Sequence, residues 1–233
     1  FAAAAEAAFI PTDKSQFFVT PTLVNTGTEL VLFDAGLSPA GITAALAAAG
    51  YEPGQVNRVV FTHFHGDHIG GLGGATPTFP NATYVAGRVE FDHWAGAGNE
   101  GFENNVRPLA ERFSFIEDGA EAAPGVTAMA TFGHAPGHMS YVIESNGQSL
   151  MVIGDLTNHP VWSLARPDWE VRFDMDKAAA AAARRRVLGM LAANRMPFVG
   201  YHMPFPSVGF VAARGEGFDY VPGHAALMTN TLG

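Results

Sequence analysis

The stretch FTHFHGDHIGG, residues 61–71, places three histidines and one aspartate within six positions after an apolar run. Polar side chains of this kind are costly to bury without partners, so their convergence requires an explanation beyond packing. His63 and His65 are two residues apart on an extended segment, and their side chains therefore point to the same face. Two imidazoles on one face suit a zinc-type site. Asp67 and His68 follow where the chain turns into a helix, and they can serve a second metal ion beside the first.

The composition restricts the class of protein and its partners. The chain has 233 residues, 48% hydrophobic and 15% charged, which is typical of a globular protein. Its formal net charge of −9 argues against a nucleic acid or an anionic membrane as partner, because both attract basic proteins. No apolar run reaches the roughly 18 residues that span a bilayer. We therefore expect a small-molecule partner. The absence of cysteine excludes disulfides, thiolate metal ligands and a cysteine nucleophile.

The first residues, FAAAAEAAFIPTDKSQFF, lack an initiator methionine and show no signal peptide. Localisation is therefore open between the cytoplasm and the periplasm or exterior, with a signal peptide already removed. No shift in composition marks a linker, and no solenoid-type repeat occurs. We expect one domain over residues 1–233.

Strand and helix patterns alternate along the chain, which indicates a layered α/β domain. We expect strands within 16–36 (two, around a turn at 25–27), 56–62, 82–86, 126–131, 139–145, 149–155, 197–202 and 218–222. We expect helices over 38–50, from 88 onward and over 174–195. Three further polar residues lie where a strand meets a loop, namely His138, Asp155 and His202. Open α/β folds build their sites at such junctions, and the two oxygens of Asp155 can bridge two cations.

These motifs resemble those of a known family. THFHGDH is similar to the T-H-x-H-x-D-H signature of the metallo-β-lactamase superfamily, and APGH, GD and a final histidine follow in that family's order. The stretches VNTGTELVLFDAG, FPNATYVA, FDMDKAAAAAARRR and HMPFPSVGFVAARGEGFDYVP most resemble the methyl parathion hydrolase branch. The resemblance implies an α/β (α+β) fold, the four-layer αββα sandwich, with an edge strand upstream of residue 1 missing.

The resemblance also implies a binuclear metal site. One ion would be held by His63, His65 and His138, the other by Asp67, His68 and His202, with Asp155 bridging. Zinc is the expected metal, with manganese, cobalt and iron open, because nitrogen and oxygen ligands do not fix its identity. The two ions would lower the pKa of a bridging water to give a hydroxide nucleophile. Asp67 and Asp155 are the catalytic carboxylates, and Asp67 or a metal-bound water would protonate the leaving group.

Residues near the ligands have candidate supporting roles. Asp34 could accept the free N–H of a ligand imidazole and fix its tautomer, or it could simply form a turn. His134 and His159 are candidates for the same supporting shell, His134 with a structural turn as the alternative. An apolar substrate needs apolar walls, and the candidate aromatic residues are Phe91, Trp94, Phe102, Phe205 and Phe210. The alternative for the first three is that they are core residues on helix faces.

The leading hypothesis is a metal-dependent hydrolase of neutral apolar esters, lactones or phosphotriesters, of the acyl-homoserine lactonase or organophosphate hydrolase type. The alternatives are a β-lactamase-type hydrolase and an iron-dependent redox enzyme on the same fold. Cleavage of RNA is disfavoured by the acidic charge, and a non-catalytic module by the filled ligand positions. The sequence does not decide between a lactone and a phosphotriester, and a homodimer is compatible with it.

Overall fold

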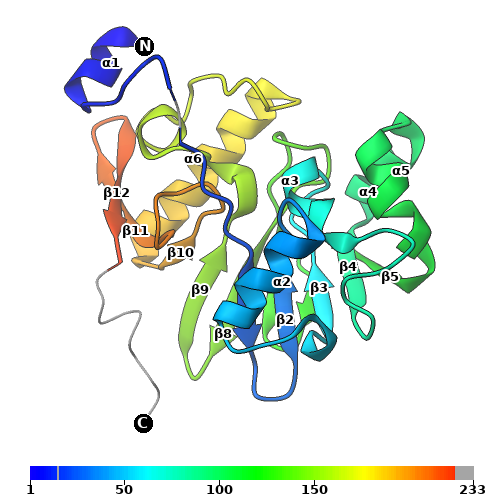
Figure 1. Ribbon diagram of the computed structural model, residues 1–233. Helices are drawn as coiled ribbons and strands as arrows, with labels where there is room; N and C mark the ends of the chain where they lie inside the picture. The colour runs from blue at the N-terminus through cyan, green and yellow to red at the C-terminus, as the bar shows by residue number, and fades with distance from the viewer. Residues whose placement is uncertain (15, 224–233) are drawn as a thin grey trace.

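The protein is described by a computed structural model over residues 1–14 and 16–223. Within these residues the chain forms two β-sheets with helices on their outer sides (Figure 1). This arrangement confirms the expected αββα sandwich. The described residues contain no helix that is both long and apolar enough to cross a membrane.

The first sheet delivers the histidine motif to the edge of the sandwich. Its strands, in spatial order, are β1 (Thr22–Asn25), β2 (Leu30–Phe33), β3 (Arg58–Val60), β4 (Thr83–Gly87) and β5 (Phe113–Ile116). β1 and β2 form an antiparallel hairpin, whereas β2, β3, β4 and β5 run parallel. Because parallel strands end at the same edge, the segment after β3 emerges where α/β sheets place their sites.

The second sheet supplies the remaining polar residues from its strand ends. Its strands are β12 (Gly217–Pro222), β11 (Val208–Arg214), β10 (Phe198–Val199), β9 (Gln148–Val152), β8 (Met139–Ser145), β7 (Val126–Ala130) and β6 (Glu121–Ala123), in spatial order. Only β9 and β10 pair in parallel, and the other neighbours are antiparallel. Asp155 follows β9 and His202 follows β10, so these two residues come from adjacent strand ends.

The helices begin at residues suited to that role. They are α1 (Ala2–Ala7), α2 (Pro39–Ala48), α3 (Gly66–Ile69), α4 (Arg88–Ala97), α5 (Glu100–Asn105) and α6 (Lys177–Asn194), joined by short turns η1 (Pro53–Gln55), η2 (Gly70–Leu72), η3 (Arg107–Arg112), η4 (Gly154–Leu156) and η5 (Pro160–Leu164). Ser38 caps α2, and Asp176 caps α6 by accepting the N–H of Ala179 at 3.0 Å. Such caps stabilise a helix by about 1 kcal/mol.

The alternation of side chains along the strands builds three hydrophobic layers. In β2, Val31 and Phe33 pack between the two sheets, whereas Leu32 faces the side covered by α2, α4 and α5. A third cluster joins the outer face of the second sheet to α6, through residues such as Leu188 and Phe198. These layers hold both sheets rigidly behind the edge where the polar residues gather.

Candidate metal centre

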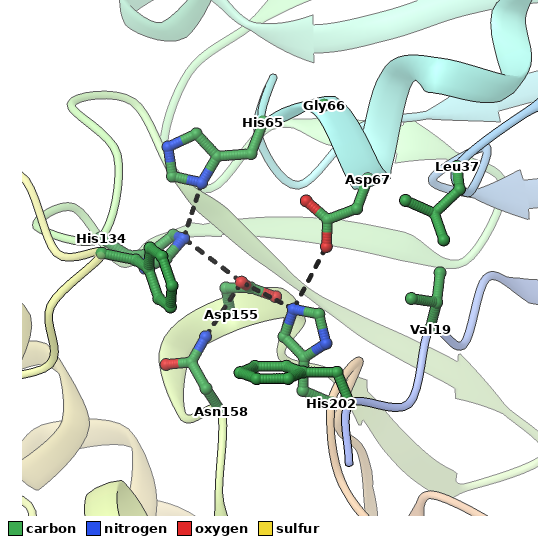
Figure 2. Close-up of a pocket in the computed structure, with 11 residues that line it drawn as sticks. Val19, Leu37, His65, Gly66, Asp67, His134, Asp155, Asn158 and His202 are labelled. Carbon is green, nitrogen blue, oxygen red and sulfur yellow. Dashed lines mark hydrogen bonds and ion pairs between the residues drawn. The ribbon is translucent and has the colours of Figure 1, made fainter. Parts of the chain in front are cut away.

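Four polar side chains come from the segment that follows β3 and runs into the short helix α3. His63 and His68 are fully buried, whereas His65 and Asp67 reach the surface of a cavity (Figure 2). The segment curls tightly because α3 spans only Gly66–Ile69. Two histidines and one aspartate from other loops complete the cluster, namely His134, Asp155 and His202.

The first donor group consists of three imidazoles. His65 Nδ1 lies 3.0 Å from His63 Nε2 and 3.0 Å from His134 Nε2. The three nitrogens lie within 4.8 Å of one another. Three nitrogen donors that converge in this way form the kind of set that binds a divalent cation such as zinc.

The second donor group combines two histidines with a carboxylate. His202 Nε2 lies 3.3 Å and His68 Nε2 lies 3.6 Å from Asp67 Oδ2. Asp155 lies between the two groups, because its oxygens are 3.3 Å from His68 Nε2, 3.1 Å from His202 Nε2 and 3.3 Å from His134 Nε2. A carboxylate in this position has one oxygen for each of two cations.

Two atoms of the cluster are buried without a hydrogen-bond partner. They are His68 Nε2 and Asp155 Oδ1, among a total of four such side-chain atoms in the described part of the chain. The two atoms lie 3.3 Å apart as an ion pair, but neither makes a hydrogen bond. Leaving a buried polar atom unpaired costs about 1–3 kcal/mol. A cation coordinated by both atoms removes that cost, so the donor set fits a metal centre on its own geometry.

The structure contradicts the assignment of His138 as a ligand. His138 Nε2 accepts the backbone N–H of Asp155 at 3.1 Å, and Nδ1 lies 2.8 Å from Thr131 Oγ1. Both ring nitrogens are therefore used inside the protein, and His138 belongs to no donor group among the described residues. His134, expected in a supporting role, stands in the donor group instead. The reason is that His138 directly precedes β8 and lies inside the sandwich, whereas His134 lies earlier in the loop.

Glycine at position 154 allows this packing behind Asp155. Its φ is +53°, and a Cβ there would lie 2.8 Å from His138 Nε2 and 2.8 Å from Thr62 Cβ. A larger residue would push apart the two loops that carry the donors. The GD pair of the sequence is thus a packing requirement as well as a source of a carboxylate.

Each of three donor histidines is oriented through its other ring nitrogen. Nδ1 of His68 lies 2.9 Å from Asp34 Oδ2, and Nδ1 of His202 lies 2.6 Å from the carbonyl of Phe18. Nδ1 of His134 lies 3.0 Å from Asp174 Oδ1. A proton held on Nδ1 leaves Nε2 as the free donor, which is the usual arrangement in metal sites.

Sequence reasoning missed Asp174 and its partner Arg184. The Arg184 side chain is fully buried, and its Nη1 donates to Asp174 Oδ2 at 2.7 Å. Its other nitrogens donate to the carbonyls of Pro167 and Trp169. An arginine within an alanine-rich helix indicates a solvated face in sequence, and only the fold shows that its head is inside.

A buried glutamate ties the two ligand loops together, and sequence reasoning missed it too. Glu90, near the start of α4, accepts the N–H of Phe64 at 2.9 Å and the N–H of Gly137 at 2.8 Å. It also accepts the indole N–H of Trp94 at 2.6 Å. Phe64 lies between two donor histidines and Gly137 lies in the loop of the third, so one carboxylate sets the distance between them. Burial raises the pKa of Glu90 above its ordinary value, against these hydrogen bonds.

The electrostatics of the cluster separate the histidines into two kinds. Burial lowers the pKa of His65 to about 4, with further lowering by neighbouring His134, and burial lowers that of His63 as well. Burial also opposes protonation of His68 and His202, yet nearby carboxylates, above all Asp34 for His68 and Asp155 for His202, outweigh it and raise both pKa values to about 10. Positive charge is therefore stabilised beside the carboxylates, where a cation would sit.

The cavity above the cluster is lined by residues other than the five predicted aromatics. It has a volume of about 520 Å³, and its apolar walls come from Phe17, Val19, Leu37 and Phe173, with Asn158 beside Asp155. Phe17 is 56% exposed and arrives from the segment before β1. Sequence reasoning missed these residues because they stand in loops far from the motif.

The five predicted pocket aromatics lie elsewhere. Phe91 and Phe102 pack in the core beside Phe64, so for them the core alternative is right. Trp94 is buried edge-on against His65, and it does not line the cavity. Phe205 is 79% exposed and, like Phe210 on β11, lies outside the cavity lining. The prediction of these five as pocket walls is therefore wrong.

His159 also lies apart from the donors. Its Nδ1 accepts the N–H groups of Val161 and Trp162 at 3.0 and 3.3 Å, and so caps the turn η5. Its ring stacks on Trp162, with centroids 5.3 Å apart. The prediction of His159 as a support for the metal ligands is contradicted by this geometry.

The comparison with known proteins identifies the family and the fold. The family model of the metallo-beta-lactamase superfamily matches residues 15–197. The chain belongs to the metallo-β-lactamase superfamily. Solved structures of similar fold match most of the chain. The crystal structure of hydrolase AbOPH, in the beta lactamase superfamily, superimposes with a TM-score of 0.89 at 26% sequence identity, and the match covers 95% of this chain and 85% of the AbOPH chain.

Curated proteins similar in sequence to this chain include N-acyl homoserine lactonases. The N-acyl homoserine lactonase of Bacillus cereus is 31% identical over 112 residues, which are 48% of this chain and 42% of that protein. N-acyl homoserine lactonase AttM of Agrobacterium fabrum (strain C58) is 29% identical over 127 residues, 49% of this chain and 46% of that protein. The match thus spans less than half the length of these curated relatives. AidC, a dizinc quorum-quenching lactonase, shares the fold with a TM-score of 0.87 at 23% identity, covering 95% of this chain and 85% of its own.

Proposed function

We propose that the chain is a binuclear metal-dependent hydrolase that opens the ring of N-acyl homoserine lactones. The observation that carries this proposal is the pair of buried donors His68 Nε2 and Asp155 Oδ1, which lie 3.3 Å apart and make no hydrogen bond, below an apolar cavity. The relatives named as N-acyl homoserine lactonases support the choice of substrate.

Seven side chains would hold the two cations. One cation would be bound by His63, His65 and His134, the other by Asp67, His68 and His202, with Asp155 shared. When bound, such a pair of cations lowers the pKa of a water molecule and polarises the carbonyl under attack. Zinc is proposed because the donors are imidazoles and carboxylates and because AidC is a dizinc lactonase. Manganese, cobalt and iron share these donors.

The cavity favours neutral substrates. No lysine or arginine lines it in the described part of the chain, so a carboxylate of the substrate would find no such side chain to bind it away from the metal donors. A β-lactam carries a carboxylate that needs such a partner, whereas a lactone does not. The walls formed by Phe17, Leu37 and Phe173 desolvate an apolar substrate and strengthen polar interactions at the floor.

Asp67 is the residue suited to handle the proton of the leaving group. Its side chain is 28% exposed in the cavity, while Asp155 is almost fully buried. Burial alone would raise the pKa of Asp67, but a hydrogen bond with His202 and the charge of His68 hold it below the ordinary value. Asp67 is therefore an acceptor at neutral pH, ready to receive a proton from water and pass it to the alcohol that leaves the ring.

The finer assignment to the methyl parathion hydrolase branch is also a proposal, and it predicts turnover of neutral phosphotriesters. The same cavity supports this second activity, because its apolar walls and the absence of lysine and arginine from its lining suit either class of neutral substrate.

The test compares both substrates on one zinc-loaded preparation. We expect hydrolysis of N-hexanoyl homoserine lactone at a higher kcat/KM than hydrolysis of paraoxon. His65→Ala should abolish both activities, whereas the control His93→Ala, which changes an exposed histidine on α4, should keep them. Faster hydrolysis of paraoxon would favour the phosphotriester branch. No hydrolysis of either substrate would refute the proposal.

A further inference from the structure

A second cavity opens beside the proposed active site. It has a volume of about 300 Å³ and shares Phe17, Asn158 and Phe173 with the cavity above the donors. Asn158 marks the junction, because its Nδ2 donates to Asp155 Oδ2 at 3.0 Å while its side chain also lines the second cavity. A molecule whose reactive end lies at the donors can therefore extend past Asn158 into this space.

The walls of the second cavity are aromatic. The rings of Trp162 and Trp169 are nearly parallel, 10° apart with centroids at 6.1 Å. Phe1, which directly precedes α1, stacks on Trp162 with ring centroids 4.4 Å apart. Charged residues that border the cavity, Glu170 and Arg172, are exposed. The space thus has the apolar lining and the volume at the lower end of small-molecule pockets.

Hydrogen bonds hold these walls in place without a ligand. The cap formed by His159 fixes the backbone of Trp162, and the buried guanidinium of Arg184 donates to the carbonyl of Trp169 at 3.0 Å. Arg184 also binds Asp174, the carboxylate that orients His134. The second cavity and the donor cluster are therefore supported by one buried network, and a preformed wall loses little conformational entropy when it binds a ligand.

We propose that the second cavity is a subsite for the apolar acyl tail of the substrate. The inference rests on the proposed function, since it takes the lactone ring to lie at the donors. The amide that follows the ring then lies level with Asn158, and the tail continues between Phe17 and Phe173 towards the two tryptophans. A tail in this subsite removes methylene groups from water, and each fully buried methylene contributes roughly a fourfold gain in binding.

The test measures the dependence of turnover on chain length. In the zinc-loaded wild type, kcat/KM should be greater for N-decanoyl than for N-butanoyl homoserine lactone by about tenfold or more. Trp162→Ala should remove most of this preference while it leaves the butanoyl substrate within about twofold. Val171→Phe, which fills the cavity from another wall, should have the same effect if the alanine variant folds poorly. Phe205→Ala changes an exposed aromatic outside both cavities and should keep the preference.

A binding measurement separates this inference from the proposed function. N-decanoyl-homoserine, the ring-opened compound, requires no turnover, and two of the three tryptophans of the chain lie in the subsite. We expect it to change tryptophan fluorescence and to bind at least about tenfold more tightly than N-butanoyl-homoserine, a gain that burial of only two of the six additional methylene groups would exceed, with the difference lost in Trp162→Ala. This result without any lactone hydrolysis would support the subsite and refute the function. The subsite would be overturned if the wild type hydrolysed lactones with no chain-length preference, or if both variants kept the wild-type preference. Either result would leave the proposed function intact.

Discussion

Replacing Asp174 by asparagine tests how the protein holds His134 in the donor group. In the wild type, one carboxylate oxygen lies 3.0 Å from His134 Nδ1 and the other accepts from Arg184 Nη1 at 2.7 Å. Asparagine has one oxygen and one amide nitrogen for these two donors. If its oxygen faces Arg184, its NH₂ faces His134, which then carries its proton on Nε2 and cannot bind a metal. If the asparagine side chain is flipped, its NH₂ group faces the Arg184 guanidinium, and two hydrogen-bond donors then face each other.

The magnitude follows from burial. Both partners of the Asp174–Arg184 ion pair are inside the protein, and loss of one partner of a buried pair costs about 3–5 kcal/mol. Loss of a carboxylate that orients a ligand histidine lowers metal affinity about 10- to 100-fold. We expect Asp174→Asn to reduce the free energy of unfolding by about 3 kcal/mol or more and to weaken binding of one zinc ion within that range.

The assay combines urea unfolding of the metal-free protein with a zinc titration against a chromophoric chelator. The matched control is Asp176→Asn, an exposed position where asparagine is an equally good cap for α6. Wild-type stability and wild-type zinc affinity in Asp174→Asn would refute the reasoning.

The pH dependence of the free energy of unfolding tests the same interaction independently. Burial alone would raise the pKa of Asp174, but hydrogen bonds from His134 and Arg184 outweigh it and hold the pKa below its ordinary value of 3.8. A carboxyl group whose pKa is lowered on folding stabilises the protein above its unfolded pKa, and this contribution is lost as the pH falls through the folded pKa. The difference in stability between wild type and Asp174→Asn should therefore be full at neutral pH and shrink below about pH 4.

Three further predictions follow from the same geometry. Glu90→Ala leaves three buried N–H groups without an acceptor and should lower the free energy of unfolding by at least about 3 kcal/mol in urea, whereas Glu117→Ala at an exposed position should change it little. Because the pKa values of His68 and His202 are raised to about 10, zinc binding at pH 7.5 should release at least about two protons per chain, one from each imidazole, measured with an indicator dye in weak buffer. The absence of proton release at pH 7.5 would contradict the protonated state of these two histidines. Phe17→Ala removes a cavity wall and should lower kcat/KM for an apolar lactone about tenfold without loss of bound zinc; an unchanged kcat/KM would remove Phe17 from the substrate site.

Local sequence signals predict the scaffold well because they act within a few residues. The cap Ser38, the turn at Gly27 and the spacing of the histidine motif each determine backbone geometry nearby. Three strands escaped the sequence analysis, namely β5, β6 and β11. β5 and β6 have only four and three residues, and glycine, alanine and arginine weaken the pattern of β11, so pairing with neighbouring strands supplies what propensity does not.

Local sequence signals do not decide whether His134 or His138 is the metal ligand. The two histidines lie four residues apart in one loop, and both follow the motif order. Only tertiary packing decides that His138 faces Thr131 and the backbone of Asp155, while His134 faces the donors. No spacing rule within the loop carries this information, because it depends on where β7 and β8 lie against the first sheet.

The walls of the cavity were beyond prediction for a related reason. Aromatic residues near the motif, such as Phe91 and Phe102, are drawn into the core by α4 and α5. The residues that do line the cavity, such as Phe17 and Phe173, come from connecting segments whose course is set by long-range contacts. A loop residue gives no periodic signal in sequence, so its position is known only from the fold.

Metal content by elemental analysis of the purified, zinc-reconstituted protein tests the central claim most directly. The structure contains donors for two cations that share Asp155, and we expect about two zinc ions per chain, falling to about one in His134→Ala. A protein that retains no zinc, or a His134→Ala variant that keeps both ions, would contradict the account of the site.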